Sequence, residues 1–182
     1  MKKWLGMLLL VSIAGCAHAQ NIFITKKGQI SFFSKTPLEN IDARNNDVAS
    51  VLNTQTGELA FAVLIKGFHF ERALMEEHFN EDYMESDKMP KANFKGKISD
   101  FAAVNMAKDG IYPVTAEGEL TIHGVTKSIH MPGVITLKDG QLEVVATFKI
   151  GPKEYDIKIP SLVADKIAET INVTVDCKYE KK

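Results

Sequence analysis

Hydrophobic and polar residues alternate with a period of two along several stretches of the chain. This pattern is typical of β-strands that bury one face. The stretches concerned are 59–65, 120–122, 142–150, 155–159 and 171–179. In the stretch 142–150, for example, Leu142, Val144 and Phe148 fall on one face and Glu143 and Lys149 on the other. Further strands are expected over 30–33 and 94–101, so the pattern predicts an all-β fold.

Turn residues separate these stretches. Thr56-Gly57, Asp109-Gly110 and Gly151-Pro152 are typical breaks. The strongest hairpin signal is Asp139-Gly140, because it lies between two alternating runs. Seven to nine short strands favour either a sandwich or an antiparallel barrel of about eight strands. A closed barrel would leave no apolar strand exposed at a sheet edge.

One segment, residues 71–80, has helical rather than strand periodicity. Phe70, Leu74 and His78 recur at a spacing of four, as do Met75 and Phe79. We therefore expect a short amphipathic helix whose apolar stripe rests on the barrel near its mouth. A second helical turn is expected around residues 162–168.

Residues 1–19 have the organisation of a secretory signal peptide. Lys2 and Lys3 precede an apolar run, and Ala17-His18-Ala19 provides small residues for cleavage before Gln20. The remainder, 20–182, is expected to be one exported domain in the periplasm. A second interpretation stays open: Ile13-Ala14-Gly15-Cys16 resembles a lipobox, in which case Cys16 is acylated and tethers the protein to a membrane.

Composition excludes several function classes. The chain has 182 residues, with 22 Lys plus Arg against 23 Asp plus Glu. No basic cluster is present, so we expect no nucleic-acid partner. Two cysteines cannot form a disulfide framework or a four-cysteine zinc site. The sequence also lacks a phosphate-binding glycine loop, and we expect neither metal nor cofactor.

The candidates for catalysis are weak. His69, His78, His123 and His130 have no metal-ligand spacing, and we expect surface or hydrogen-bonded histidines. Cys177 falls on the apolar face of the last expected strand and is predicted to pack in the core. No nucleophile elbow is present. We therefore predict that the protein is not an enzyme, with a histidine-dependent reaction of His78 or His123 on a small amphiphile as a minor alternative.

The chain contains ten phenylalanines, several of them around the expected helix. They form either a well-filled core or the wall of a cavity. A barrel of eight strands is the size at which its interior is either just filled or holds one small ligand. Periodicity alone leaves both interpretations open.

Three motifs in order resemble the YceI-like family of exported lipid-binding barrels. Residues 68–79 (FHFERALMEEHF) match its Met-x-x-His pattern at Met75 and His78. Residues 89–96 (MPKANFKG) match Pro-x-x-x-Phe, and residues 118–126 (GELTIHGVT) match Gly-x-Leu-Thr-x-x-Gly-Val-Thr. The resemblance covers about residues 22–180. Phe79, where many members have Leu, and the polar pair His130-Met131 depart from it.

The resemblance implies an extended lipocalin-like barrel that holds a polyisoprenoid or another long-chain isoprenoid or fatty amphiphile. From the expected facing of the strands, the candidate wall residues are Phe61, Val63, Ile65, Leu120, Ile122, Val144, Phe148 and Val173. The candidate mouth residues are Phe70, Leu74, Met75, His78 and Phe94. A filled barrel that acts as an envelope stress or interaction protein is the alternative, and a homodimer stays open.

Overall fold

The computed structural model of the chain describes residues 21–182. The expected signal peptide and Cys16 therefore lie outside the described residues. The strands are β1 (Ile22–Lys35), β2 (Asn40–Asn53), β3 (Glu58–Leu64), β4 (His69–Phe70), β5 (Lys91–Ser99), β6 (Gly110–Ile122), β7 (Val125–Lys138), β8 (Gln141–Ile150) and β9 (Ile171–Lys181). The α-helix α1 (Ala73–His78) continues into the π-helical turn η2 (Phe79–Tyr83). Four 3₁₀ turns complete the described elements: η1 (Ile65–Gly67), η3 (Phe101–Ala103), η4 (Pro152–Tyr155) and η5 (Ser161–Lys166).

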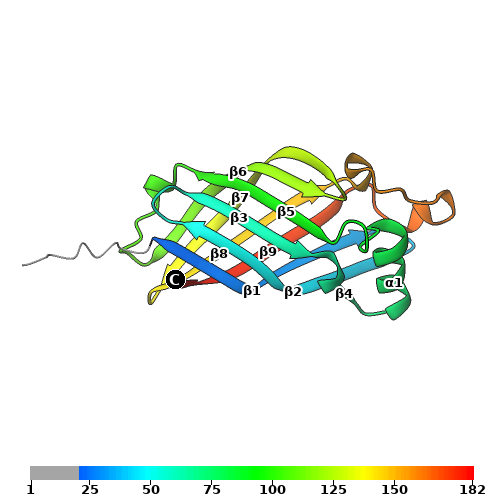
Figure 1. Cartoon of the computed structure of the whole chain (residues 1–182), viewed down its shortest axis with the longest axis horizontal. Coiled ribbons are helices and arrows are strands. Elements are labelled where there is room, and N and C mark those ends of the chain that lie inside the picture. Colours follow the sequence, from blue (N-terminus) through cyan, green and yellow to red (C-terminus); the bar gives the residue numbers. More distant parts are fainter. Residues whose placement is uncertain (1–20) are drawn as a thin grey trace, which may run out of the picture.

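Eight of the strands close into an antiparallel barrel, which confirms the predicted fold class. The sheet runs in the order β1-β9-β8-β7-β6-β5-β3-β2, and pairing of β1 with β2 closes it. The short strand β4 continues the pairing of β2 beyond β3. In Figure 1 the helix α1 and the long connection between β8 and β9 lie together at the end of the barrel remote from the C-terminus and from the start of β1.

Two tight hairpins fix the register of β6, β7 and β8. Asp139 and Gly140 both have positive φ, and Lys138 pairs with Gln141. His123 and Gly124 form an equivalent turn between β6 and β7. Positive φ at both turn positions matches the right-handed twist of the flanking strands. The hairpin predicted at Asp139-Gly140 is therefore confirmed.

The strand β2 was not apparent from hydrophobic alternation. Its inward positions are Ala43, Asn45, Val48, Ser50 and Leu52, all of which are buried. Two of these are polar, and both are satisfied by backbone partners: the Asn45 Nδ2 donates to the Leu64 carbonyl at 2.8 Å, and the Ser50 hydroxyl donates to the Ala60 carbonyl at 2.8 Å. A search for apolar residues at every second position cannot detect such a strand.

The strand expected over 155–159 does not form. Pro152 begins the 3₁₀ turn η4, and Asp156 then adopts a left-handed conformation with φ of 54°. Tyr155 and Ile157 are nevertheless both buried. Buried and exposed residues therefore do alternate here, as the sequence predicted. The cause is the 3₁₀ turn, since the segment does not pair with a neighbouring strand. Likewise β5 ends at Ser99, before the predicted limit at residue 101, because Asp100 is also left-handed.

The helix expected over 71–80 is confirmed in place but is shorter, and the helical turn predicted around 162–168 corresponds to η5.

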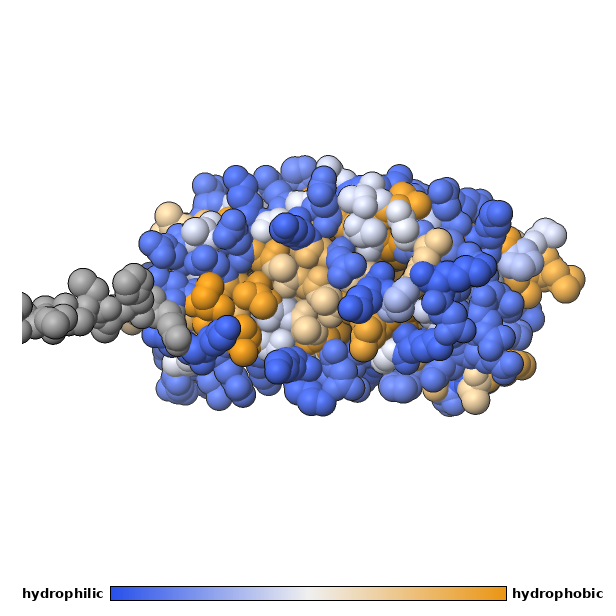
Figure 2. Space-filling model, in the orientation of Figure 1, coloured by the Kyte–Doolittle hydropathy of each residue, from blue (hydrophilic) through white to orange (hydrophobic). Residues whose placement is uncertain are grey.

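The strand β3 has apolar residues on its outer face as well as on its inner face, which explains why both faces of the stretch 59–65 are apolar in the sequence. Ala60, Ala62 and Leu64 point outward and are exposed, as is Val51 on the adjacent β2. Figure 2 shows this apolar area in the middle of an otherwise largely polar face.

Candidate functional site

The barrel interior contains a small apolar cavity of about 70 Å³, which we call the inner cavity. Side chains of the strands supply its wall. Its lining residues are Ile30, Leu59, Phe61, Val63, Ala92, Asn93, Phe94, Ile98, Val114, Ala116, Leu120, Met131, Gly133, Val144, Ala146, Phe148 and Val175. The volume is less than half of the roughly 150 Å³ cavity that admits benzene. The inner cavity alone therefore cannot hold a long hydrocarbon tail.

A larger cavity of about 330 Å³, which we call the mouth cavity, lies at the end of the barrel that carries α1. The β1–β2 turn, the segment from β4 to η2, and the connection from β8 to β9 enclose it. Its lining residues are Phe32, Ser34, Glu39, Ile41, Phe70, Arg72, Leu74, Met75, His78, Phe79, Tyr83, Met84, Pro152, Ile157, Ile159, Val163, Lys166, Ile167 and Ile171. This volume falls at the lower end of the usual range for small-molecule sites, about 300–1,000 Å³.

The residues named from sequence divide among three places. Phe61, Val63, Phe94, Leu120, Val144 and Phe148 line the inner cavity. Phe70, Leu74, Met75 and His78 line the mouth cavity. Ile65, Ile122 and Val173 line neither. Phe94, expected at the mouth, thus lies inside the barrel.

The three residues outside both cavities are buried in the protein core. Ile65 is 2% exposed and belongs to η1 instead of the end of β3. Ile122 is the last residue of β6 and packs in the same core cluster as Ile65. Val173 is paired between Phe32 on β1 and Phe148 on β8.

Four phenylalanine rings lie between the two cavities, and we call them the aromatic cluster: Phe32, Phe68, Phe70 and Phe79. Their ring centroids are 5.1 to 5.7 Å apart in five pairs. Phe32, Phe70 and Phe79 line the mouth cavity. The hydrophobic cluster that contains Phe68 also contains Val63 and, packed against it, Phe61, both from the inner cavity. The aromatic cluster therefore contacts side chains of both cavities.

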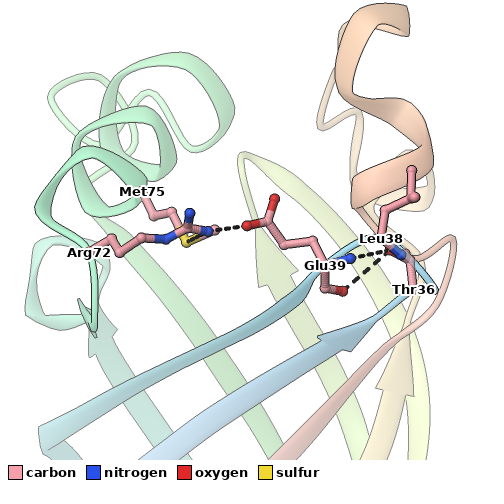
Figure 3. A network of polar contacts seen from close by, with 5 residues as sticks. All are labelled: Thr36, Leu38, Glu39, Arg72 and Met75. Carbon is pink, nitrogen blue, oxygen red and sulfur yellow. Dashed lines mark hydrogen bonds and ion pairs between the residues drawn. The ribbon is translucent and has the colours of Figure 1, made fainter.

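An ion pair spans the opening of the mouth cavity (Figure 3). The Arg72 guanidinium, just before α1, donates to the Glu39 carboxylate of the β1–β2 turn, and its Nη2 also contacts the Met75 sulfur at 3.2 Å. The Thr36 hydroxyl fixes that turn by accepting hydrogen bonds from the backbone N–H groups of Leu38 at 3.2 Å and Glu39 at 3.0 Å. The charged groups are thus held at the rim, above an apolar floor.

A buried histidine connects two other segments at this end. His123 was expected to be either at the surface or hydrogen-bonded; its side chain is only 9% exposed, lies in the β6–β7 turn and is in hydrogen-bond contact. Its Nδ1 lies 3.2 Å from the Tyr155 carbonyl oxygen, and its Nε2 lies 3.4 Å from a Glu85 carboxylate oxygen. Hydrogen bonding to Lys88, followed by the weaker effect of His123, lowers the pKa of Glu85. His123 therefore links η4 to the loop that precedes β5.

Several lining residues were not assigned to a cavity by the hydrophobic pattern. Pro152, Ile157, Ile159, Val163 and Ile167 belong to the β8–β9 connection, whose folding onto the mouth depends on contacts distant in sequence. Phe32 did fall within an expected strand, although its facing toward a cavity was not assigned. Arg72 and Glu39 come from separate loops, and only the closed barrel brings them together.

Cys177 packs in the core, as predicted. It is fully buried, and burial followed by the charge of Asp176 raises the pKa of its thiol to about 12. The thiol is therefore not a nucleophile at neutral pH.

Within residues 21–182, no group of three His, Cys, Asp or Glu side chains is arranged to hold a metal ion. In the same part of the chain, no helix combines the length and apolar character needed to span a bilayer.

Residues 22–179 match the sequence model of the YceI-like domain. The match spans nearly all of the described chain, and it agrees with the three motifs noted in the sequence. No curated protein matches the chain.

Several solved structures share the fold at low sequence identity. A polyisoprenoid-binding domain from Saccharophagus degradans, implicated in plant cell wall breakdown, superposes with a TM-score of 0.78 at 15% identity, covering 90% of this chain and 99% of that one. BcnA of Burkholderia cenocepacia gives 0.70 at 12% identity, covering 85% and 96%. The YceI protein of Campylobacter jejuni gives 0.58 at 18% identity, covering 77% and 85%. These likenesses establish the barrel architecture.

Proposed function

The chain belongs to the YceI-like family, and from this premise we propose that it is an exported binding protein for a polyisoprenoid or another long-chain amphiphile. The observation that carries the proposal is the mouth cavity, which is open at the barrel end and lined mostly by apolar side chains. The similarity to the polyisoprenoid-binding domain from Saccharophagus degradans supports a polyisoprenoid as one candidate ligand. The proposal includes no reaction.

The size of the mouth cavity sets what it can hold. Scaled from the cavity that admits benzene, about 330 Å³ accommodates about a dozen carbon atoms. Each buried methylene contributes about 0.8 kcal/mol, so such a segment gains on the order of 10 kcal/mol before the cost of ordering the ligand. Apolar burial on this scale supports binding of a hydrocarbon tail without any directional contact.

A tail longer than this must displace the aromatic cluster. Rotation of Phe32, Phe68 and their neighbours would join the mouth cavity to the inner cavity and open the barrel interior. Side-chain rotation of this kind costs little where a ligand replaces the lost ring contacts. We therefore propose that the tail enters at the mouth and extends along the barrel axis past these rings.

Organic extraction followed by mass spectrometry tests the proposal. Protein purified from its native host without detergent is expected to carry a long-chain lipid in near-stoichiometric amount. The matched variants are Val163→Trp, which fills the mouth cavity, and Leu162→Trp, whose position is 89% exposed and outside the lining. Lipid should disappear from the first variant and remain in the second. An empty extract from the wild-type protein would overturn the proposal.

The alternative hypothesis, a filled barrel that binds no ligand, predicts that the interior is packed along its whole length. The aromatic cluster and the small inner cavity fit that alternative, whereas the mouth cavity of about 330 Å³ does not. The extraction separates the two hypotheses, because a filled barrel carries no lipid in either variant.

Export is the second part of the proposal, and the first nineteen residues support it. Amino-terminal sequencing of the mature protein is expected to begin at Gln20 if a secretory signal peptidase acts. Incorporation of labelled palmitate into the wild type, and its loss in Cys16→Ser, would instead indicate a lipid tether. Recovery of the uncleaved, unlabelled chain from the cytoplasm would contradict export altogether.

A further inference from the structure

The charged residues around the mouth cavity are sorted by sign. Along the segment from β4 to η2, the cavity is lined by Arg72 and His78. The acidic residues Glu71, Glu76 and Glu77 of the same segment line a separate shallow pocket on the other side of α1. Within α1, Leu74 and His78 lie four residues apart and both line the mouth cavity, whereas Glu76 and Glu77 line the other pocket.

The connection between β8 and β9 shows the same sorting. Lys166 lines the mouth cavity beside Val163 and Ile167, whereas neighbouring Asp165 and Glu169 do not. Among residues 21–182, Lys166 has no ion-pair partner. Its ammonium group is therefore an uncompensated positive charge beside an apolar space.

The donor count of Arg72 points the same way. A guanidinium has five N–H donors. In the described structure, Nη2 serves both the Glu39 carboxylate and the Met75 sulfur, which leaves Nε and Nη1 without a partner. Glu39 is the single acid among the lining residues. The rim therefore has two permanent cations against one anion.

From this asymmetry we infer that the protein selects amphiphiles with an anionic head group, a carboxylate or a phosphate monoester. This inference rests on the proposed function, since it requires the tail to occupy the mouth cavity. The head group would lie at the rim between Arg72 and Lys166, where it would accept hydrogen bonds from the free guanidinium donors. Charge-assisted bonds of this type are about twice as strong as neutral ones.

Three ligands of equal chain length test the inference: palmitate, hexadecyl phosphate and hexadecanol. Their dissociation constants for delipidated protein can be measured by displacement of a fluorescent lipid probe below the micellar concentration. The two anions are expected to bind at least tenfold more tightly than the alcohol. Comparing palmitate with hexadecyl phosphate then identifies which anion the rim prefers.

The variants distinguish the rim charges from surface charge in general. Lys166→Gln should weaken palmitate binding several-fold and weaken hexadecanol binding much less, so that the preference for the anion falls. Lys158→Gln is the matched control, because Lys158 is an exposed lysine of the same connection that does not line the cavity. Glu39→Gln should strengthen palmitate binding, because it removes the competing carboxylate and frees an Arg72 donor.

Equal binding of the alcohol and both anions, or identical effects of Lys166→Gln and Lys158→Gln, would overturn the inference while leaving lipid binding intact. Failure of all three ligands to bind would instead count against the proposed function.

Discussion

The two cavities differ in what builds their walls, and this difference explains their sizes. Strands in regular register line the inner cavity, and their side chains interdigitate until only about 70 Å³ remains. The mouth cavity is enclosed by a short helix, a β-turn and the irregular β8–β9 connection, and it has about 330 Å³. Regular pairing thus gives a tight, stable interior, whereas irregular connections leave space for a ligand.

This difference predicts that a valine-to-alanine substitution lowers stability more in the wall of the inner cavity than in the wall of the mouth cavity. Val144→Ala, at a position 5% exposed on β8, should lower the free energy of unfolding by about 2 to 3 kcal/mol through lost burial and an enlarged cavity. Val163→Ala, in the partly exposed rim, should cost about 1 kcal/mol or less. Urea denaturation of delipidated protein measures both values. Equal losses would show that the two walls are packed alike.

A second prediction concerns the polar contacts inside the barrel wall. The Ser50 hydroxyl and the Tyr179 hydroxyl lie 2.6 Å apart, both in buried side chains. Because Ser50 donates to the Ala60 carbonyl, it accepts from Tyr179. Ser50→Ala would leave the Tyr179 donor buried without a partner, and we expect a loss of about 1 to 2 kcal/mol.

The control for this variant is Ser128→Ala, at an exposed position on β7, which should change stability by a few tenths of a kcal/mol at most. If Ser50→Ala were equally neutral, the hydroxyl pair that joins β2 to β9 would contribute nothing to stability.

Ser50 also shows where prediction from sequence stops. The strands that could be predicted, such as β8 and β9, bury apolar residues at every second position. The strand β2 buries Asn45 and Ser50 instead, and their partners are the carbonyls of Leu64 and Ala60. Polar residues become core residues only when another segment satisfies them. The sequence therefore predicted the barrel and its strand-borne wall, but not this closing strand.

In the candidate site, too, the residues on regular strands could be assigned from the sequence, and the residues of the loops could not. Phe61, Val144 and Phe148 could be assigned to the interior because strand alternation fixes facing. Most of the mouth cavity could not be assigned in this way. Ile157 and Ile159 mimic a strand although they follow a 3₁₀ turn, and Arg72 meets Glu39 only through chain closure.

The smallest change in stability is expected in the loop that precedes β5. There Glu85 forms ion pairs with Lys88 and His123. Glu85 has a lowered pKa, so its carboxylate stabilises the fold above its ordinary pKa of 4.5, and this contribution is lost as the pH falls through the lowered value. Glu85→Gln should therefore reduce Tm by roughly 1 to 3 °C at pH 7 and by less at pH 4, which is below the ordinary pKa of the carboxyl group. Glu81→Gln, on the exposed η2 turn, is the control and should shift Tm less at either pH. A Tm difference for Glu85→Gln that was the same at pH 4 as at pH 7 would mean that packing, and not the charge of Glu85, holds this loop against His123. The loops around the mouth would then be held by close packing, as the strand-built interior is.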